Sequence, residues 1–188
     1  MNVKEAINER RAYRSLKKIS VSKELLYDLF SCAELAPSCF NNQPWRYIAV
    51  FDPETLEKVF SSFSKGNEWA FESSLVIAVC SKKEDDCVIK NRQYFLFDTG
   101  ISVGFLILRA TELGLVAHPI AGFDEEKAKD ILAIPNEFTL ISFVIIGKRS
   151  EKLNPVLSPK QIEAENKRPE RLALGTILHL NKYGQQIN

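Results

Sequence analysis

Apolar side chains recur every three or four positions in several stretches of this chain, which is the spacing of a helix with one buried face. One such stretch begins after Asn2 and runs to about Arg10, and a second begins after Ser22 and stops before Pro37. Asparagine and serine are favourable N-cap residues, and proline cannot continue a helix. The pattern therefore predicts two helices before the first proline.

Other segments have the composition of β-strands. Residues 45–51 are rich in aromatic and branched side chains, residues 75–80 form a short apolar run, and residues 138–147 are the most strand-like part of the chain. Asp52 followed by proline opens a helix after the first of these strands, and Asp124 caps another that runs to about residue 134. Helices and strands therefore alternate.

The longest predicted helix covers about residues 86–113. Its centre, residues 101–108, is apolar nearly all round, which predicts burial on every side and hence a central helix. Gly100 and Gly104 lie one turn apart on it, where they allow another backbone to pack closely. Gly114 is a natural stop.

The character of the chain changes after Arg149. Pro155 and Pro159 favour an extended tail, yet residues 172–180 are apolar and need a surface to pack against. A second subunit would provide that surface. We therefore expect a single domain over residues 1–188, in which residues 150–188 form an extension that embraces a partner subunit.

The composition narrows the functional classes. The 188 residues carry a net charge of +1 with 45% hydrophobic and 26% charged residues, so the chain is neither disordered nor a strongly basic nucleic-acid binder. No window is long and apolar enough for a membrane span, and the first residues do not resemble a secretory signal. We expect a cytoplasmic protein with no membrane or nucleic-acid partner.

The cysteines and histidines do not have the spacing of a metal site. Cys32, Cys39, Cys80 and Cys87 form no C-x-x-C motif, and the two histidines are far apart. We therefore expect no bound metal, no disulfide scaffold and reduced cysteine thiols.

Three arginines crowd the end of the first predicted helix. The guanidinium groups of Arg10, Arg11 and Arg14 repel one another unless an anion joins them, and their planar donors suit phosphate oxygens. A solvated basic face would have the same composition. Charge alone leaves both interpretations open.

Two further segments could present a ligand with fixed polar groups. Prolines restrict both ends of the loop at residues 37–44, which could offer Ser38, Asn41 and Gln43 to a flat heteroaromatic ligand, although such a loop can also be a simple turn. Gly122 allows close backbone approach before the next helix. Nothing in the chain supplies a hydrolytic triad.

Together these segments resemble the FMN-dependent nitroreductases. The sequence R-R-A-Y-R at residues 10–14 is similar to the family's R-R-S-x-R opening, and A-P-S-C-F-N-N-Q-P-W at residues 36–45 is similar to A-P-S-x-x-N-x-Q-P-W. Residues 113–124 resemble the family's G-L and P-I-x-G-F-D segment. The three motifs occur in the family's order and spacing and span nearly the whole chain.

The resemblance implies an α+β fold in which helices pack a central, mostly antiparallel sheet around a buried central helix, with the C-terminal tail extending over the partner subunit. It implies a homodimer with FMN at the subunit interface, hydride transfer from NADPH or NADH, and reduction of a nitroaromatic, quinone or related acceptor by a ping-pong mechanism. The flavin carries the chemistry, so no catalytic side chain is expected. The cofactor-binding residues implied by the resemblance are Arg10, Arg11, Arg14, Pro37, Ser38, Cys39, Asn41, Gln43, Pro119, Ile120, Ala121, Gly122 and Arg168.

The sequence departs from the family pattern at several positions. Ala12 and Cys39 stand where serine is common, Ala121 where glutamate is common, and Gly104 where many members carry a bulkier polar side chain. The acceptor and the choice between NADH and NADPH therefore stay open. Two alternatives also stay open: a non-enzymatic FMN storage or sensor module, and a flavin-dependent oxidase or dehydrogenase of the same fold.

Overall fold

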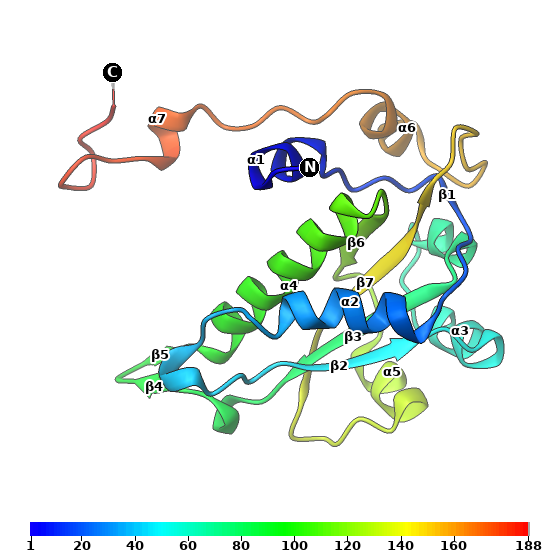
Figure 1. Cartoon of the computed structure of the whole chain (residues 1–188), viewed down its shortest axis with the longest axis horizontal. Helices are drawn as coiled ribbons and strands as arrows, with labels where there is room; N and C mark the ends of the chain where they lie inside the picture. The colour runs from blue at the N-terminus through cyan, green and yellow to red at the C-terminus, as the bar shows by residue number, and fades with distance from the viewer. Residues whose placement is uncertain (188) are drawn as a thin grey trace.

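A five-stranded antiparallel sheet forms the centre of the molecule (Figure 1). A computed structural model describes residues 1–187. The longest strand, β7 (Thr139–Arg149), pairs on one side with β3 (Leu75–Ser81), which in turn pairs with β2 (Arg46–Val50). On its other side β7 pairs with β6 (Val116–Ile120) and, at its end, with the short β1 (Leu16–Lys17). The expected α+β fold with an antiparallel sheet is confirmed.

Helices cover both faces of this sheet, which explains why its central strands are apolar on both sides. Along β3, Val76 and Ala78 join the core under α3 (Pro53–Phe60) and α5 (Glu125–Leu132). The alternate residues, such as Ile77, join the core under α2 (Lys23–Ala33) and α4 (Phe95–Glu112). Successive strand side chains point to opposite faces, so this one strand supplies two cores.

Side-chain caps begin the helices where the sequence predicts them. Asn2 accepts a hydrogen bond from the Glu5 amide at the start of α1 (Val3–Glu9), and Ser22 does the same for α2. Asp52 and Asp124 cap α3 and α5. Each cap satisfies an amide that the helix itself leaves unpaired.

The central helix differs from its prediction in two ways. It begins at Phe95 rather than near residue 86, because the preceding residues form a short 3₁₀ turn (Lys83–Asp85) and the hairpin of β4 (Val88–Ile89) and β5 (Arg92–Gln93). Burial of residues 101–108 on every side is also wrong for the single chain, since Phe105 is 40% exposed, and Phe97, one turn before that stretch, is 65% exposed. Beside it, a Cβ added to Gly100 or Gly104 would meet no atom within 4 Å. One face of α4 is therefore open.

The tail is less extended than predicted. Ser158 and Gln161 form a capping box at the start of α6 (Pro159–Asn166), a helix that the sequence interpretation missed. Beyond it the chain runs over α1 to the short α7 (Leu174–Ile177), as Figure 1 shows in orange and red. Leu172 and Ile177 are 70% and 64% exposed, so the described part of the chain leaves this apolar end largely uncovered. Among residues 1–187, no helix has both the length and the hydropathy that crossing a membrane requires.

Candidate functional site: an arginine cluster and a cross-linked loop

The two ends of the chain meet at a cluster of arginines. Arg168, in the tail, donates through Nη2 to the backbone carbonyl of Asn8 and, at 3.0 Å, to that of Arg10. These contacts place Arg168 beside the segment that carries Arg10 and Arg14. The fold thus brings Arg168 next to the first arginine motif, while its role in binding a phosphate stays a prediction.

The cluster has more positive charge than the surrounding protein neutralises. Burial lowers the pKa of Arg10, and the nearby charges of Arg168 and Arg171 lower it further. Burial also lowers the pKa of Arg14, although Glu165 opposes that shift. Within residues 1–187 the guanidinium groups of Arg10 and Arg14 have no hydrogen-bonded or salt-bridged partner. An anion placed here would relieve the repulsion.

A buried carboxylate that the sequence interpretation missed holds this segment in place. Glu165 is 4% exposed, and its two oxygens accept the backbone N–H groups of Arg14 at 2.6 Å and Ser15 at 3.2 Å. The acceptor lies on α6, 151 residues further along the chain than Arg14. No local pattern marks a glutamate for this role, because its partners are backbone amides.

Arg11 does not join the other arginines in the same way. Its Nη2 donates to the carbonyls of Ala164 at 2.6 Å and Glu165 at 3.2 Å, at the end of α6. Its guanidinium also lies 4.6 Å from the ring centroid of Tyr13. The side chain is thus engaged in joining the N-terminal segment to the tail.

His118 lies buried behind the cluster as a neutral side chain. Burial lowers its pKa to about 4, and the charges of Arg14 and Arg10 act in the same direction, against the hydrogen bond to Tyr13. The ring stacks on Trp69 with centroids 4.5 Å apart. Its Nδ1 lies 3.1 Å from the Tyr13 carbonyl, so this nitrogen carries the proton and donates it. These contacts give His118 a structural role.

The segment after His118 is the end of edge strand β6 and the turn that follows it. Pro119 and Ala121 are exposed, whereas Ile120 is buried in the core. Gly122 is packed against the chain's own Asn67: a Cβ at this position would lie 2.7 Å from Asn67 Nδ2, which already donates to the Gly122 carbonyl. Glycine is therefore needed here for the close approach of another loop.

The loop at residues 37–44 is held in an uncommon backbone conformation. Phe40, Asn41 and Gln43 have φ angles of 48°, 60° and 51°, a region that residues other than glycine seldom occupy. Ser38 Oγ accepts the Gln43 amide at 3.0 Å, and Gln43 Nε2 donates to the Asn41 carbonyl at 3.1 Å. Ser38 and Gln43 thus brace the loop, while the Phe40 ring is 89% exposed.

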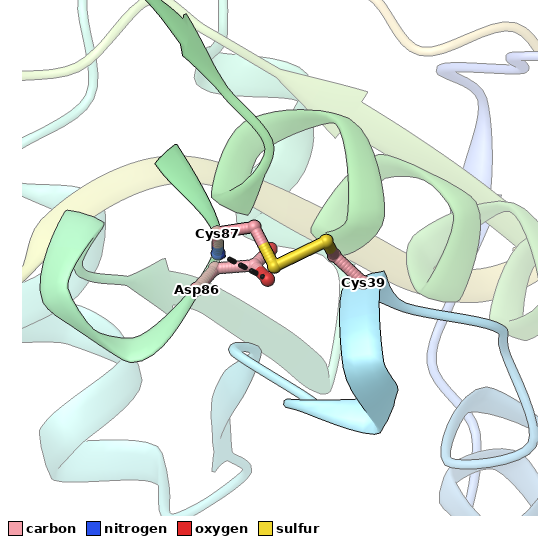
Figure 2. Close-up of side chains that lie close together, drawn as sticks. All are labelled: Cys39, Asp86 and Cys87. Carbon is pink, nitrogen blue, oxygen red and sulfur yellow. Dashed lines mark hydrogen bonds between the residues drawn. A yellow bond between two sulfur atoms is a disulfide. The ribbon is translucent and has the colours of Figure 1, made fainter. Parts of the chain in front are cut away.

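The expectation that all cysteines are reduced thiols is wrong for two of them. Cys39 and Cys87 form a disulfide with their Cα atoms 6.0 Å apart, as Figure 2 shows, whereas Cys32 and Cys80 are free. The bond joins residues 48 positions apart, which the fold brings together by placing the β4–β5 hairpin beside the loop. Sequence spacing gives no sign of such a pairing. Together with the adjacent Asp86, the two cysteines offer atoms of the kinds that bind metal ions, but here the two sulfur atoms are bonded to each other.

Two carboxyl groups lie beside this disulfide. Asp98, on α4, is 3% exposed and accepts the Cys39 amide at 2.6 Å. Burial raises the pKa of Asp98 and the neighbouring Asp86 raises it further, while the bond from Cys39 opposes the shift. Asp86 accepts its own neighbour's amide, that of Cys87, at 2.8 Å. The loop is therefore tied both to α4 and to the hairpin.

The arginine cluster and the loop lie at opposite ends of α4. The loop contacts Asp98 near its start, whereas Arg11 and Tyr13 line a cleft with Thr111 near its end. Thirteen residues of helix span about 20 Å at 1.5 Å per residue. Figure 1 shows the same separation between the light blue loop and the dark blue N-terminal segment. One chain presents two distinct half-sites.

The sequence matches the family model of the nitroreductase family over residues 7–68 and 53–148. The chain belongs to the nitroreductase family. As a nitroreductase-family enzyme it is an oxidoreductase, and the family resemblance seen in its motifs is confirmed. The tail, which supplies Glu165 and Arg168, lies beyond the matched residues.

Relatives of this nitroreductase-family chain match it over most of their length. MhqN of Bacillus subtilis, which carries an NAD(P)H nitroreductase name, is 29% identical over 185 residues, covering 79% of this chain and 90% of that protein. NADH dehydrogenase of Thermus thermophilus is 26% identical over 186 residues, covering 82% and 90%. A solved structure of an oxidoreductase containing FMN superposes with a TM-score of 0.85 at 24% identity, covering 99% and 95%.

Proposed function

We propose that this protein is an FMN-dependent oxidoreductase that takes hydride from NADPH or NADH and reduces a nitroaromatic, quinone or related acceptor. The arginine cluster carries the proposal: Arg10, Arg14 and Arg168 gather where the chain offers them no counter-ion. In a nitroreductase-family fold, a terminal phosphate is the anion that fits. The FMN in the solved structure of the same fold supports this choice.

The residues present fit FMN at both half-sites. Arg10, Arg14 and Arg168 would hold the phosphate, and Arg11 would support them by fixing the tail. The exposed Pro37, Phe40 and Asn41 would border the ring system, with Ser38, Cys39 and Gln43 shaping the loop from within. Pro119, Ile120, Ala121 and Gly122 would form the second wall, with Pro119 and Ala121 facing out.

When bound, FMN would supply the hydride-transfer chemistry between the nicotinamide and the acceptor. The protein's own groups bind and orient it. Neutral His118 adds no charge beneath the cluster, so the guanidinium groups remain free to meet the phosphate. The proposal requires no side chain as acid, base or nucleophile, because the flavin would carry the chemistry.

The two half-sites would meet in a homodimer. The open face of α4 carries Phe97 and Phe105 next to Gly100 and Gly104, and none of residues 1–187 covers it. The exposed apolar tail around Leu174 would extend over the partner. Exposed apolar patches of this kind mark association surfaces. In this arrangement each FMN would contact the arginine cluster of one subunit and the loop of the other.

The cofactor proposal is tested on purified protein by releasing and chromatographing the bound flavin. We expect FMN rather than FAD, because the cluster is sized for one terminal phosphate and the chain has no glycine-rich pyrophosphate motif. Anaerobic NADPH or NADH should bleach the flavin absorbance, and an added acceptor should restore it. A protein that binds no flavin after reconstitution, or binds FAD, would contradict the proposal.

The reaction class is tested by steady-state kinetics at several acceptor concentrations. Parallel double-reciprocal lines would support the ping-pong mechanism, since donor and acceptor then use the same site in turn. A protein that binds FMN but oxidises no NAD(P)H with any acceptor would instead be a storage or sensor module. Sedimentation with and without FMN tests the dimer: FMN held between subunits lowers the concentration at which they dissociate.

A further inference from the structure

We propose that the Cys39–Cys87 disulfide is a thiol–disulfide exchange site for external dithiols, and that its redox state sets the order of the loop at residues 37–44. The effect on cofactor affinity rests on the proposed function, because it assumes that this loop borders FMN. Exchange itself, and the ordering of the loop, depend only on the geometry of this chain.

The disulfide joins two segments that share few other contacts. Besides the S–S bond, Asn42 Nδ2 donates to Asp86 Oδ1 at 3.3 Å and approaches Cys87 Sγ at 3.5 Å. The first is longer than a usual N–H···O hydrogen bond, and the second is to sulfur, which is a weak acceptor. The hairpin itself stands at the surface, with Val88 47% exposed. Without the cross-link, only these contacts and the bridge through Arg46, which donates to the Gln43 carbonyl at 2.9 Å and pairs with Asp85 at 3.4 Å, would hold the hairpin side against the loop.

The backbone of the loop needs such restraint. The left-handed region of backbone conformation is occupied by Phe40, Asn41 and Gln43. Residues other than glycine keep this conformation only where the surrounding structure imposes it. The Cys39 amide bound to Asp98 fixes one point of the loop, and the Cys39 sulfur bound to Cys87 fixes another. Breaking the second restraint should release the exposed part of the loop, including Phe40.

The bond is accessible to a reagent of modest size. Cys39 and Cys87 are both only partly buried, unlike Cys80, which is 2% exposed and whose thiol pKa burial raises to about 12. Cys32 is the other free thiol, and it belongs to α2 rather than to the loop. A dithiol can therefore reach the disulfide while the buried thiol stays inert.

The exchange balances without any further reactant. A thiolate of the external dithiol attacks one sulfur of the disulfide, the Cys39–Cys87 bond breaks, and a mixed disulfide forms while the other cysteine leaves as a thiolate and takes up a proton. The second thiol of the reagent then displaces the remaining cysteine. Two electrons and two protons pass to the protein, and the dithiol becomes a cyclic disulfide; the reverse reaction restores the cross-link.

The first experiment measures exchange in dithiothreitol buffers of graded redox ratio, followed by quenching, denaturing alkylation and intact mass. The oxidised protein should take two labels, on Cys32 and Cys80, and the reduced protein four. Cys87→Ser should take three labels at every ratio. The matched control Cys32→Ser should take one label when oxidised and three when reduced, so it keeps the difference of two labels between the states. Four labels in protein that was never exposed to reductant would overturn the proposal.

The second experiment compares the apo-protein in both redox states by hydrogen exchange. Reduction should speed exchange of the amides of Asn41, Asn42 and Gln43, and Cys87→Ser should show the fast rates in either state. In the strands of the sheet, the hydrogen-exchange rates of the wild type should be the same before and after reduction. Equal loop rates in both states would overturn the locking role, whatever the protein binds.

The third experiment titrates oxidised and reduced protein with FMN after anaerobic removal of the dithiol. Reduction should weaken binding by about tenfold, because a disordered loop must be ordered on binding. Cys32→Ser should keep this difference, and Cys87→Ser should bind like reduced protein. Equal affinities overturn the coupling to the cofactor. Faster loop exchange in a protein that binds no FMN would instead contradict the proposed function and leave the lock supported.

Discussion

The two ends of α4 are built on different principles. At the arginine end, hydrogen bonds join segments more than 150 residues apart, and a buried carboxylate fixes the backbone of Arg14 and Ser15. At the loop end, one covalent bond and short-range contacts hold residues 37–44 in a strained conformation. The first end is fixed by the fold as a whole, whereas the second depends on a disulfide that a reductant can cleave.

The ends also differ in charge. Guanidinium groups dominate one end, while Asp86 and Asp98 lie under the loop at the other. A dianionic phosphate would be attracted more strongly by the first end, where the guanidinium groups of Arg10 and Arg14 have no hydrogen-bonded partner among the described residues, than by the second. The difference would therefore set the direction in which FMN lies, independently of any contact with its ring.

The largest expected effect concerns the fixed end. Glu165→Ala leaves two backbone amides without their acceptor in a buried position, so it should lower the free energy of unfolding by about 3–5 kcal/mol. Urea denaturation measures the loss. Glu163→Ala, on an exposed position of the same helix, is the matched control and should change stability little. Similar stabilities for the two variants would show that Glu165 does not fix the arginine end.

A somewhat smaller effect should follow from pH. The pKa of His118 is about 4 in the folded protein and about 6.5 when unfolded, so the unfolded chain binds the proton more readily. Stability should therefore fall as the pH drops below 6.5 and level off below about pH 4, by about 3 kcal/mol in total from this group. Denaturation curves of wild type and His118→Gln isolate the contribution, since carboxylates titrate alike in both. If the difference in unfolding free energy between the two proteins stayed constant across this pH range, the prediction would be contradicted.

The smallest effect is the most direct test of the contrast in charge. Arg14→Ala or Arg10→Ala should weaken FMN binding by about 1–3 kcal/mol, because each removes a charge-assisted contact to phosphate. The loss should shrink at high salt. Arg92→Ala, in the hairpin, removes the same charge from the other end and should leave affinity nearly unchanged. If all three variants behave alike, the arginines act only through net charge.

Local chemistry made much of the fold predictable. Asn2, Ser22, Asp52 and Asp124 cap helices because capping depends on one side chain and the next few amides. The start of α6 carried the same information in Ser158 and Gln161, but the prolines around it suggested an extended chain. The sequence thus contained the signal for this helix, but the prediction relied on the prolines instead.

The candidate site was less predictable, because its assembly depends on distant parts of the chain. The arginine motif could be found as a cluster of charge, yet only the fold shows that Arg11 serves the end of α6 and that Glu165 fixes Arg14. The Cys39–Cys87 bond and the hairpin that carries Cys87 likewise depend on tertiary contact. The overlong helix prediction hid both, since it assigned residues 86–94 to the helix and left no hairpin in that part of the chain.

The joining of the two chain ends also has a consequence for how the protein is made. Arg14 leaves the ribosome among the first residues, but Glu165 and Arg168 follow some 150 residues later. During synthesis the sheet can form around β7 while the N-terminal arginines have no partner from the tail. The cluster is therefore completed only after the tail has left the ribosome, and until then the growing chain has no finished pocket in which to capture an anion.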